Sequence, residues 1–148
     1  MIPTVSAGPA RSQAGAATLP PVRVAVVDNH PLLRDSIRSI LGDAGDMEWV
    51  GEATDGGEAV ELVTRTRPDV VLMDLSMPGT DGLTATRSIV GSSPDTQVLV
   101  LTSSTDPSRL RHSIGAGASG VLAKDGDPST ILTGIRALMG DWLPVQTS

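Results

Sequence analysis

Short apolar runs alternate with longer segments of helical periodicity from residue 22 to about residue 140. The first run, Val22–Val27, is rich in β-branched residues and predicts a strand. Met47–Ala53 alternates only loosely and predicts a weaker strand at an edge of the sheet. The runs 70–73 and 98–101 are wholly apolar, which is typical of strands buried on both faces of a parallel sheet. A last short strand is expected at 121–123.

Each apolar run is followed by a segment in which apolar residues recur at helical spacing. Pro31, Pro107 and Pro128 each stand where a proline can open a helix, whereas Pro68 ends the second helical segment. The expected helices are 31–41, 56–67, 83–90, 107–114 and 128–138. Alternating strands and helices of this kind predict one α/β domain around a parallel sheet.

The first 21 residues show neither the alternation of a strand nor the apolar spacing of a helix. They consist mainly of Ala, Gly, Pro, Ser and Thr with a single charge at Arg11, so residues 1–21 are expected to be a disordered tail. A secretory signal would need a basic start and an apolar core, and this segment has neither. We therefore expect a cytoplasmic protein.

Composition removes several classes of function. The chain has 148 residues, which suits one compact core, and no apolar run is long enough to span a bilayer. A net charge of -6 gives little attraction for nucleic-acid phosphates. Without cysteine there are no disulfides and no thiolate chemistry, and an aromatic content of 1% leaves almost no platform on which a base or a flavin could stack.

A polar residue follows four of the predicted strands at the point where each ends. Asp28 and Asn29 follow the first strand, Asp74 the third, Thr102 the fourth and Lys124 the fifth. Ligands of open α/β sheets bind at the carboxyl ends of the strands, so these side chains are expected to share one site.

Their chemistry suits transfer of a phosphoryl group. Two converging carboxylates, Asp28 and Asp74, would repel each other unless a divalent cation such as Mg²⁺ accepted their oxygens. A carboxylate can also accept a phosphoryl group if an ammonium and a hydroxyl neutralise the transferred oxygens. Asp74 would be the acceptor, with Thr102 and Lys124, the only lysine of the chain, in the other two roles.

The segments that carry these residues resemble the receiver domain of bacterial two-component response regulators of the NarL/FixJ (LuxR-type) subfamily. They are VVDNHPLLRDSIRSIL, DVVLMDLSMPGTDGL, VLVLTSS and GASGVLAKD, in the order expected for that family. The resemblance covers residues 22–140 as one receiver domain. It implies a flavodoxin-like (βα)5 three-layer sandwich with a five-stranded parallel sheet of order 2-1-3-4-5.

The resemblance also implies partners and roles. A phosphohistidine of a sensor histidine kinase would donate its phosphoryl group to Asp74, with Mg²⁺ bound by Asp28, Asn29, Asp74 and the backbone carbonyl of Ser76. Thr102 corresponds to the hydroxyl that moves toward the new phosphoryl group, and Lys124 to the ammonium that pairs with it. The family signals through this modification and is not a class of enzymes.

Two positions depart from the family pattern. Asn29 replaces an acid that is often a direct metal ligand, so weaker Mg²⁺ binding is expected because one charge is lost. Val121 stands where a Tyr or Phe usually responds to phosphorylation. These departures motivate an alternative function, a receiver-like interaction module that does not depend on phosphorylation.

The resemblance extends to the end of the chain. Residues 141–148 resemble the start of the linker that leads to a helix-turn-helix output domain in this subfamily, so DNA would be contacted only through such a domain. The chain is therefore expected to be either an excised receiver or a stand-alone one. A homodimer is one assembly that the resemblance allows. A dehalogenase-like phosphatase is disfavoured because it needs a second acid where Ser76 stands, and His30 is interpreted as a packing or capping residue.

Overall fold

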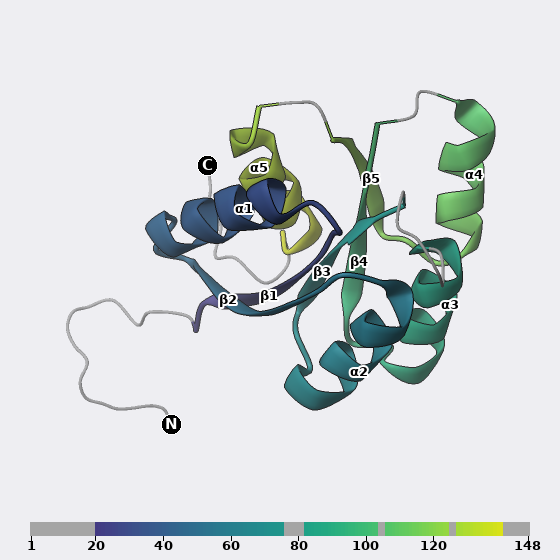
Figure 1. Cartoon of the computed structure of the whole chain (residues 1–148), viewed down its shortest axis with the longest axis horizontal. Helices are drawn as coiled ribbons and strands as arrows, with labels where there is room; N and C mark the ends of the chain where they lie inside the picture. The colour runs from purple at the N-terminus through teal and green to yellow at the C-terminus, as the bar shows by residue number, and fades with distance from the viewer. Residues whose placement is uncertain (1–19, 76–81, 104–105, 125–126, 141–148) are drawn as a thin grey trace.

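The structure is a computed structural model that describes residues 20–75, 82–103, 106–124 and 127–140. Strands and helices alternate through these residues (Figure 1). The strands are β1 (Val22–Val27), β2 (Met47–Ala53), β3 (Val70–Asp74), β4 (Gln97–Thr102) and β5 (Gly120–Ala123). The helices are α1 (Pro31–Asp43), α2 (Gly56–Thr66), α3 (Gly82–Ser92), α4 (Pro107–Gly115) and α5 (Ser129–Leu138).

Parts of the sequence-based predictions lie outside the described residues. These parts are residues 1–19 of the expected tail, Ser76, and the expected linker start at 141–148. Pro20 and Pro21 are exposed and belong to no helix or strand. No helix among the described residues is long and apolar enough to cross a membrane.

The five strands form one parallel sheet in the order β2-β1-β3-β4-β5. This order confirms the expected 2-1-3-4-5 topology and places the loosely alternating strand, β2, at an edge. After β1 the chain forms β2 on one side of β1, and the next strand, β3, pairs with β1 on its other side. The topological switch point therefore lies between β1 and β3, where open α/β sheets bind their ligands.

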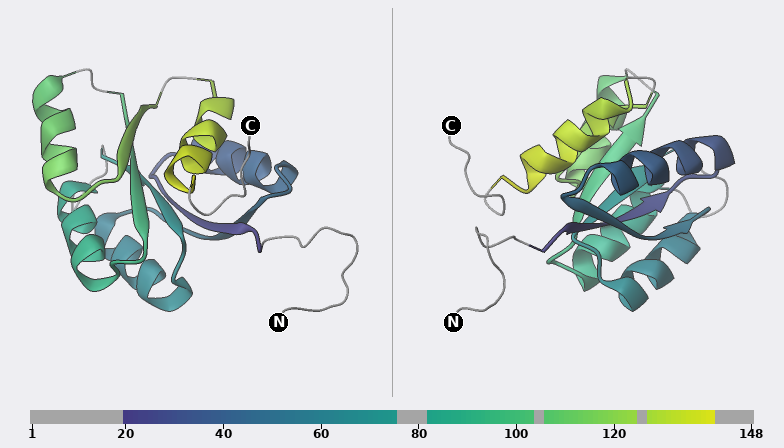
Figure 2. Two further views of the ribbon diagram at one scale, coloured as in Figure 1. Left: turned by 180° about the vertical axis from the view of Figure 1, so that it is seen from behind. Right: turned by 90° about the vertical axis from the view of Figure 1, so that its left-hand side faces the viewer.

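Side chains of alternate residues point to opposite faces of the sheet, so each central strand supplies two cores. Val24 and Val26 of β1 pack in the core beneath α1 and α5, whereas Ala25 and Val27 pack in the core beneath α2 and α3. Two helices therefore cover one face and the remaining three cover the other (Figure 2). Both faces of β3 are buried, which explains its uninterrupted apolar sequence.

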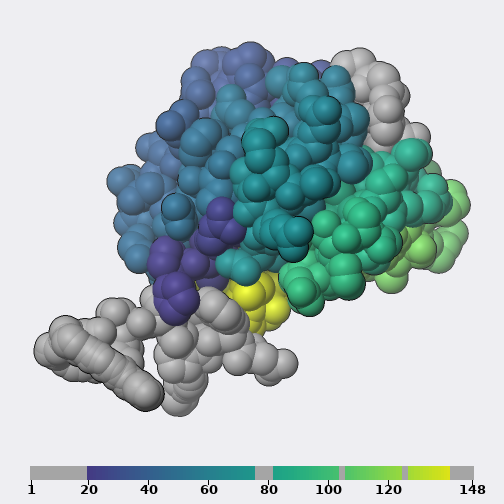
Figure 3. Space-filling view, turned by 90° about the horizontal axis from the view of Figure 1, so that it is seen from below, coloured from purple at the N-terminus to yellow at the C-terminus, as the bar shows by residue number. Residues whose placement is uncertain are grey.

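The boundaries of α2 show how local sequence sets the elements. The side chain of the N-cap residue Asp55 accepts a hydrogen bond from the Glu58 amide at 2.9 Å, which satisfies an amide without a partner in the first helical turn. Glu58 accepts a hydrogen bond of 2.9 Å from the amide of Thr54, the residue before the N-cap. At the other end Arg67 adopts a left-handed conformation with φ 50°, and Pro68 prevents the helix from continuing. In the space-filling view from below, the teal and green residues of the α2–α3 part of the chain form a continuous surface (Figure 3).

One ion pair connects α5 to the loop that precedes β2. Arg136 donates two hydrogen bonds of 2.9 Å to the two carboxylate oxygens of Asp46. Both side chains are more than one third exposed, so solvent screens the attraction. The hydrogen bond from Arg136 nevertheless lowers the pKa of the Asp46 carboxyl below its ordinary value of 3.8.

We predict a small, pH-dependent loss of stability on replacing Arg136 by Gln. The pKa of the Asp46 carboxyl is lowered in the folded state, so the ion pair stabilises the fold fully above about pH 3.8, the ordinary pKa of the carboxyl. This stabilisation disappears as the pH falls through the lowered pKa of the folded state. The free energy of unfolding should fall by about 0.5 kcal/mol at pH 7 and be unchanged at the lowest pH at which the protein stays folded. Urea unfolding at both pH values measures this change. The double variant Asp46→Asn/Arg136→Gln should lose no more free energy of unfolding than Arg136→Gln alone. A loss of equal size at both pH values would contradict the assignment.

Candidate functional site

Two buried carboxylates lie at the switch point of the sheet. Asp28 directly follows β1, and its amide donates a hydrogen bond of 3.0 Å to the carbonyl of Ala53 in β2. Asp74 is the last residue of β3 and pairs in register with Leu101 of β4. Both aspartates have 0% exposure, so neither carboxylate is stabilised by bulk water. Burying like charges this close requires compensating positive charge.

Lys124 provides that charge from the end of β5. Its Nζ lies 2.9 Å from Oδ2 of Asp74 and 3.2 Å from Oδ2 of Asp28, and its side chain is 13% exposed. The amide of Lys124 donates a hydrogen bond of 2.8 Å to the carbonyl of Thr102, which fixes the backbone next to β4. One ammonium thus bridges both carboxylates and leaves a single negative charge on the three groups.

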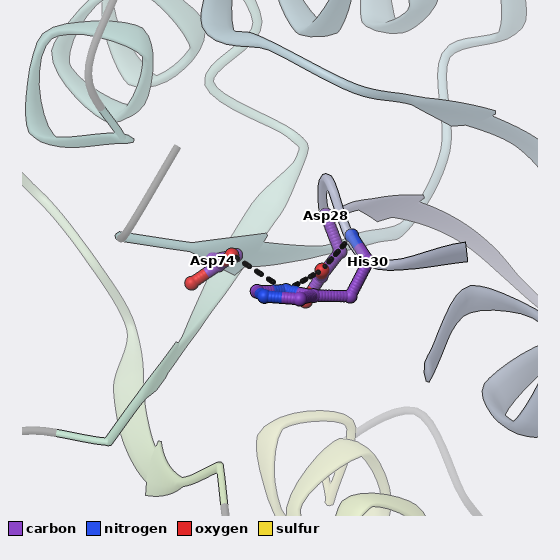
Figure 4. Close-up of side chains that lie close together, drawn as sticks. All are labelled: Asp28, His30 and Asp74. Carbon is purple, nitrogen blue, oxygen red and sulfur yellow. Dashed lines mark hydrogen bonds and ion pairs between the residues drawn. The ribbon is translucent and has the colours of Figure 1, made fainter. Parts of the chain in front are cut away.

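His30 is also part of this cluster, although the sequence led us to interpret it as a packing or capping residue. Its ring Nδ1 lies 2.9 Å from Oδ1 of Asp28, 4.0 Å from Oδ2 of Asp74 and 3.1 Å from Nζ of Lys124. The ring points toward Asp74 and makes no capping hydrogen bond to α1, at whose N-cap position the residue stands (Figure 4). The spacing to Asp28 was the available signal, because an Asp side chain often binds the amide two residues later, as it does here at 2.7 Å.

Two further predicted residues, Asn29 and Thr102, lie at the same edge. Oδ1 of Asn29 is buried and has no hydrogen-bond partner among the described residues. Thr102 is 4% exposed and ends β4, one residue beyond the partner of Asp74. Ser76 follows Asp74 by two residues and lies outside the described part of the chain.

Arg34 supports the pocket from α1, and sequence reasoning did not single it out. Its guanidinium donates a hydrogen bond of 2.7 Å to the carbonyl of Asp28, and its Nε lies 3.3 Å from a carboxylate oxygen of Glu52 in β2. The loop after β1 is thereby held between the sheet and α1. An arginine in a helical segment gives no sequence signal for such a contact, since its partner is a backbone carbonyl.

The donor set fits a hard divalent cation. Ligand atoms of Asp28, His30 and Asp74 all lie within 4.8 Å of one another. Asn29, which directly follows Asp28 in the chain, has a buried Oδ1 without a hydrogen-bond partner among the described residues. Carboxylate and amide oxygens are the ligands that Mg²⁺ prefers.

Gly82, the first residue of α3, packs directly against the backbone of Asp74. A Cβ atom at this position would lie 2.6 Å from the carbonyl oxygen of Asp74 and 3.0 Å from Cα of Leu75. Thr86 secures the same turn of α3, since its hydroxyl donates a hydrogen bond of 2.7 Å to the carbonyl of Gly82. The backbone at the end of β3 is therefore so close to the start of α3 that only glycine fits at position 82.

Solved structures similar to this one include response regulators and a receiver domain. The signal receiver domain of the response regulator NarL from Mycobacterium tuberculosis superposes with a TM-score of 0.78 at 34% identity, covering 82% of this chain and 99% of that one. A LuxR-family two-component response regulator from Aurantimonas sp. SI85-9A1 gives a TM-score of 0.77 at 34% identity, covering 82% of this chain and 86% of that one.

The sequence matches the model of the response regulator receiver domain over residues 24–136, and the chain therefore belongs to that family. Its relatives include the transcriptional regulatory protein DegU of Brevibacillus brevis, 37% identical over 117 residues, which are 79% of this chain and 50% of DegU. The response regulator UvrY of Escherichia coli K12 is 41% identical over 117 residues, which are 79% of this chain and 54% of UvrY. The chain thus spans about half the length of these relatives, and it is a receiver domain of the NarL/LuxR type.

Replacing Gly82 by Ala should disturb the end of β3. The added methyl group meets backbone atoms that cannot move independently, so we expect the free energy of unfolding to fall by about 1–3 kcal/mol. Gly91 in the same helix is the matched control, because a Cβ there meets nothing within 4 Å. Gly91→Ala should be neutral or slightly stabilising through its higher helix propensity. Equal effects of the two substitutions in urea unfolding would show that the contact at Asp74 is unimportant.

Replacing Lys124 by Met should leave two buried carboxylates without their ammonium. We expect the free energy of unfolding to fall by about 3 kcal/mol in the absence of divalent cations, because a buried charge loses its partner. Adding Asp74→Asn to this variant removes one of the two charges and should restore part of the loss. If the double variant were as unstable as Lys124→Met alone in urea unfolding, charge burial would not be the cause.

Proposed function

We propose that this receiver domain acts as a phosphorylation-controlled switch in a two-component phosphorelay, with Asp74 as the phosphoacceptor. The observation that carries the proposal is the contact of the fully buried Asp74 with Lys124, beside a second buried acid at the switch point of the sheet. Two buried carboxylates that share one ammonium contribute little net stability, so their arrangement at the switch point favours a chemical role.

The proposed reaction transfers a phosphoryl group from a phosphohistidine of a sensor histidine kinase. An oxygen of Asp74 attacks phosphorus while the bond between phosphorus and the donor nitrogen breaks, and the electron pair of that bond stays on the imidazole. The ammonium of Lys124 pairs with the transferred oxygens, and the hydroxyl of Thr102 donates a hydrogen bond to them. Asp28, Asn29, Asp74 and the backbone carbonyl of Ser76 would hold Mg²⁺, which when bound offsets the negative charge of the phosphoryl group.

The switch would start from the redistribution of contacts around Lys124. An aspartyl phosphate brings about −1.5 to −2 charge, so the ammonium would exchange its carboxylate partner for phosphoryl oxygens. Since the amide of Lys124 is hydrogen-bonded to Thr102, a change at either residue affects the other. Val121 of β5 packs against the core under α2 and α3. A structural change at β5 on phosphorylation would therefore reach this core through an aliphatic side chain.

The proposed partners follow from the family. A sensor histidine kinase would act upstream, and DNA would be reached only through a helix-turn-helix output domain, with a homodimer as one possible assembly. We place the protein in the cytoplasm and treat the chain as a signalling domain without an enzymatic role of its own.

Phosphorylation can be tested without knowing the kinase. Incubation with Mg²⁺ and acetyl phosphate should add one phosphoryl group to the wild type, measured by intact mass, because a small donor needs only the pocket. Asp74→Asn and a wild-type sample with EDTA should remain unmodified. An adduct on Asp74→Asn would place the acceptor elsewhere.

The alternative is a receiver-like interaction module that does not depend on phosphorylation. Asn29 favours it, because the pocket has one carboxylate fewer than is usual in the family and should bind Mg²⁺ less tightly. Under this alternative the wild type takes no phosphoryl group and shows no Mg²⁺ binding by calorimetry. A single Mg²⁺-dependent adduct would exclude it.

A further inference from the structure

We propose that the imidazole of His30 is a direct ligand of the divalent cation bound at this pocket, and that it adapts the site to transition cations such as Co²⁺, Ni²⁺ or Zn²⁺. The inference rests on the proposed function, since it concerns the metal of the same pocket. It goes further because it adds a nitrogen donor to a site otherwise made of oxygen atoms.

The ammonium of Lys124 already marks a position for a cation. Its Nζ lies 2.9 Å from Oδ2 of Asp74, 3.2 Å from Oδ2 of Asp28 and 3.1 Å from Nδ1 of His30. Nδ1 can donate a proton to Oδ1 of Asp28 in one tautomer or present its lone pair to Nζ of Lys124 in the other, and the second tautomer is the form that binds a metal. One atom from each of the three residues thus surrounds a single positive charge.

The separations among the ligand atoms suit one metal ion. Nδ1 of His30 lies 2.9 Å from Oδ1 of Asp28 and 4.0 Å from Oδ2 of Asp74. Ligands bonded to one ion at about 2.1 Å lie about 3 Å apart when adjacent and about 4.2 Å apart when opposite. The separations of 2.9 and 4.0 Å are close to these two distances, so only small movements would bring Nδ1, one carboxylate oxygen of Asp28 and Oδ2 of Asp74 onto a common ion.

The backbone of His30 is fixed for this role, while its ring stays accessible. Its amide donates a hydrogen bond of 2.7 Å to Oδ1 of Asp28, which holds the residue against the carboxylate. The side chain is 58% exposed, so a hydrated cation can reach the ring and the second ring nitrogen can bind water.

The choice of cation follows from the donor types. Mg²⁺ prefers oxygen ligands and gains little from an imidazole, whereas Co²⁺, Ni²⁺ and Zn²⁺ bind imidazole nitrogen well. With Asn29 in place of an acid the pocket also has less negative charge with which to attract Mg²⁺. His30 therefore strengthens binding of the transition cations more than binding of Mg²⁺.

The test uses the untagged chain, Co²⁺ and Mg²⁺ as probes, and the variants His30→Ala and His112→Ala. His112 is the matched control, since it is the other histidine of the chain and lies exposed on α4. In proton NMR the Co²⁺-loaded wild type should show one strongly shifted, solvent-exchangeable signal from the ring N–H of a bound imidazole. His30→Ala should lose this signal and His112→Ala should keep it.

Calorimetry supplies the second readout. His30→Ala should bind Co²⁺ on the order of tenfold more weakly, with Mg²⁺ affinity changed less than about twofold. The proposal is overturned if the wild type shows no shifted signal, if the signal depends on His112, or if His30→Ala weakens both cations equally. Circular dichroism on His30→Ala excludes a folding defect as the reason for any loss.

These outcomes are independent of the phosphorylation test. A wild type that takes no phosphoryl group from acetyl phosphate, yet shows the His30-dependent signal, would refute the proposed function and leave the metal ligand in place. A wild type that is phosphorylated but lacks that signal would support the proposed function and refute His30 as a metal ligand.

Discussion

The burial of two carboxylates next to each other is the constraint on which the site depends. Asp28 and Asp74 are fully buried, and the ammonium of Lys124 reaches both. Removing charges from water costs several kcal/mol for each ion, so the pocket is stable only while all three groups keep their places. The parallel sheet meets this requirement because β1, β3 and β5 end at the same edge and deliver one charged residue each. The hydrophobic cores on the two faces of the sheet fix those strand ends.

Much of this arrangement could be predicted from the sequence. The apolar runs of β1, β3 and β5 each lead into a charged residue, and parallel strands end at a common edge, so Asp28, Asp74 and Lys124 were expected together. The edge position of β2 followed from its loose alternation, whereas the sheet order came from the family resemblance. These features depend on backbone periodicity and on motif order, both of which can be read along a chain.

The contacts that sequence reasoning missed depend on side-chain direction and on distant partners. Whether the ring of His30 caps α1 or turns toward Asp28 is decided by a rotamer, and no periodicity reports it. Gly82 stands just before the helix expected at 83–90, and nothing in the sequence indicates its close approach to the Asp74 carbonyl. Arg136 and Asp46 are 90 positions apart, and neither stands in a motif. Such contacts emerge only once the strands have set the distances between helices.

The use of a single lysine has a practical consequence. Every other basic side chain apart from the two histidines is an arginine, so amine-reactive reagents can modify only Lys124 and the chain's α-amino group. In this structure the side chain of Lys124 is 13% exposed and its ammonium is paired with two carboxylates, which should slow its acylation. Any ligand that takes over those carboxylates would release the amine and raise its reactivity. The chain therefore carries an internal chemical reporter at the centre of its site, which can be read by mass without adding a label elsewhere.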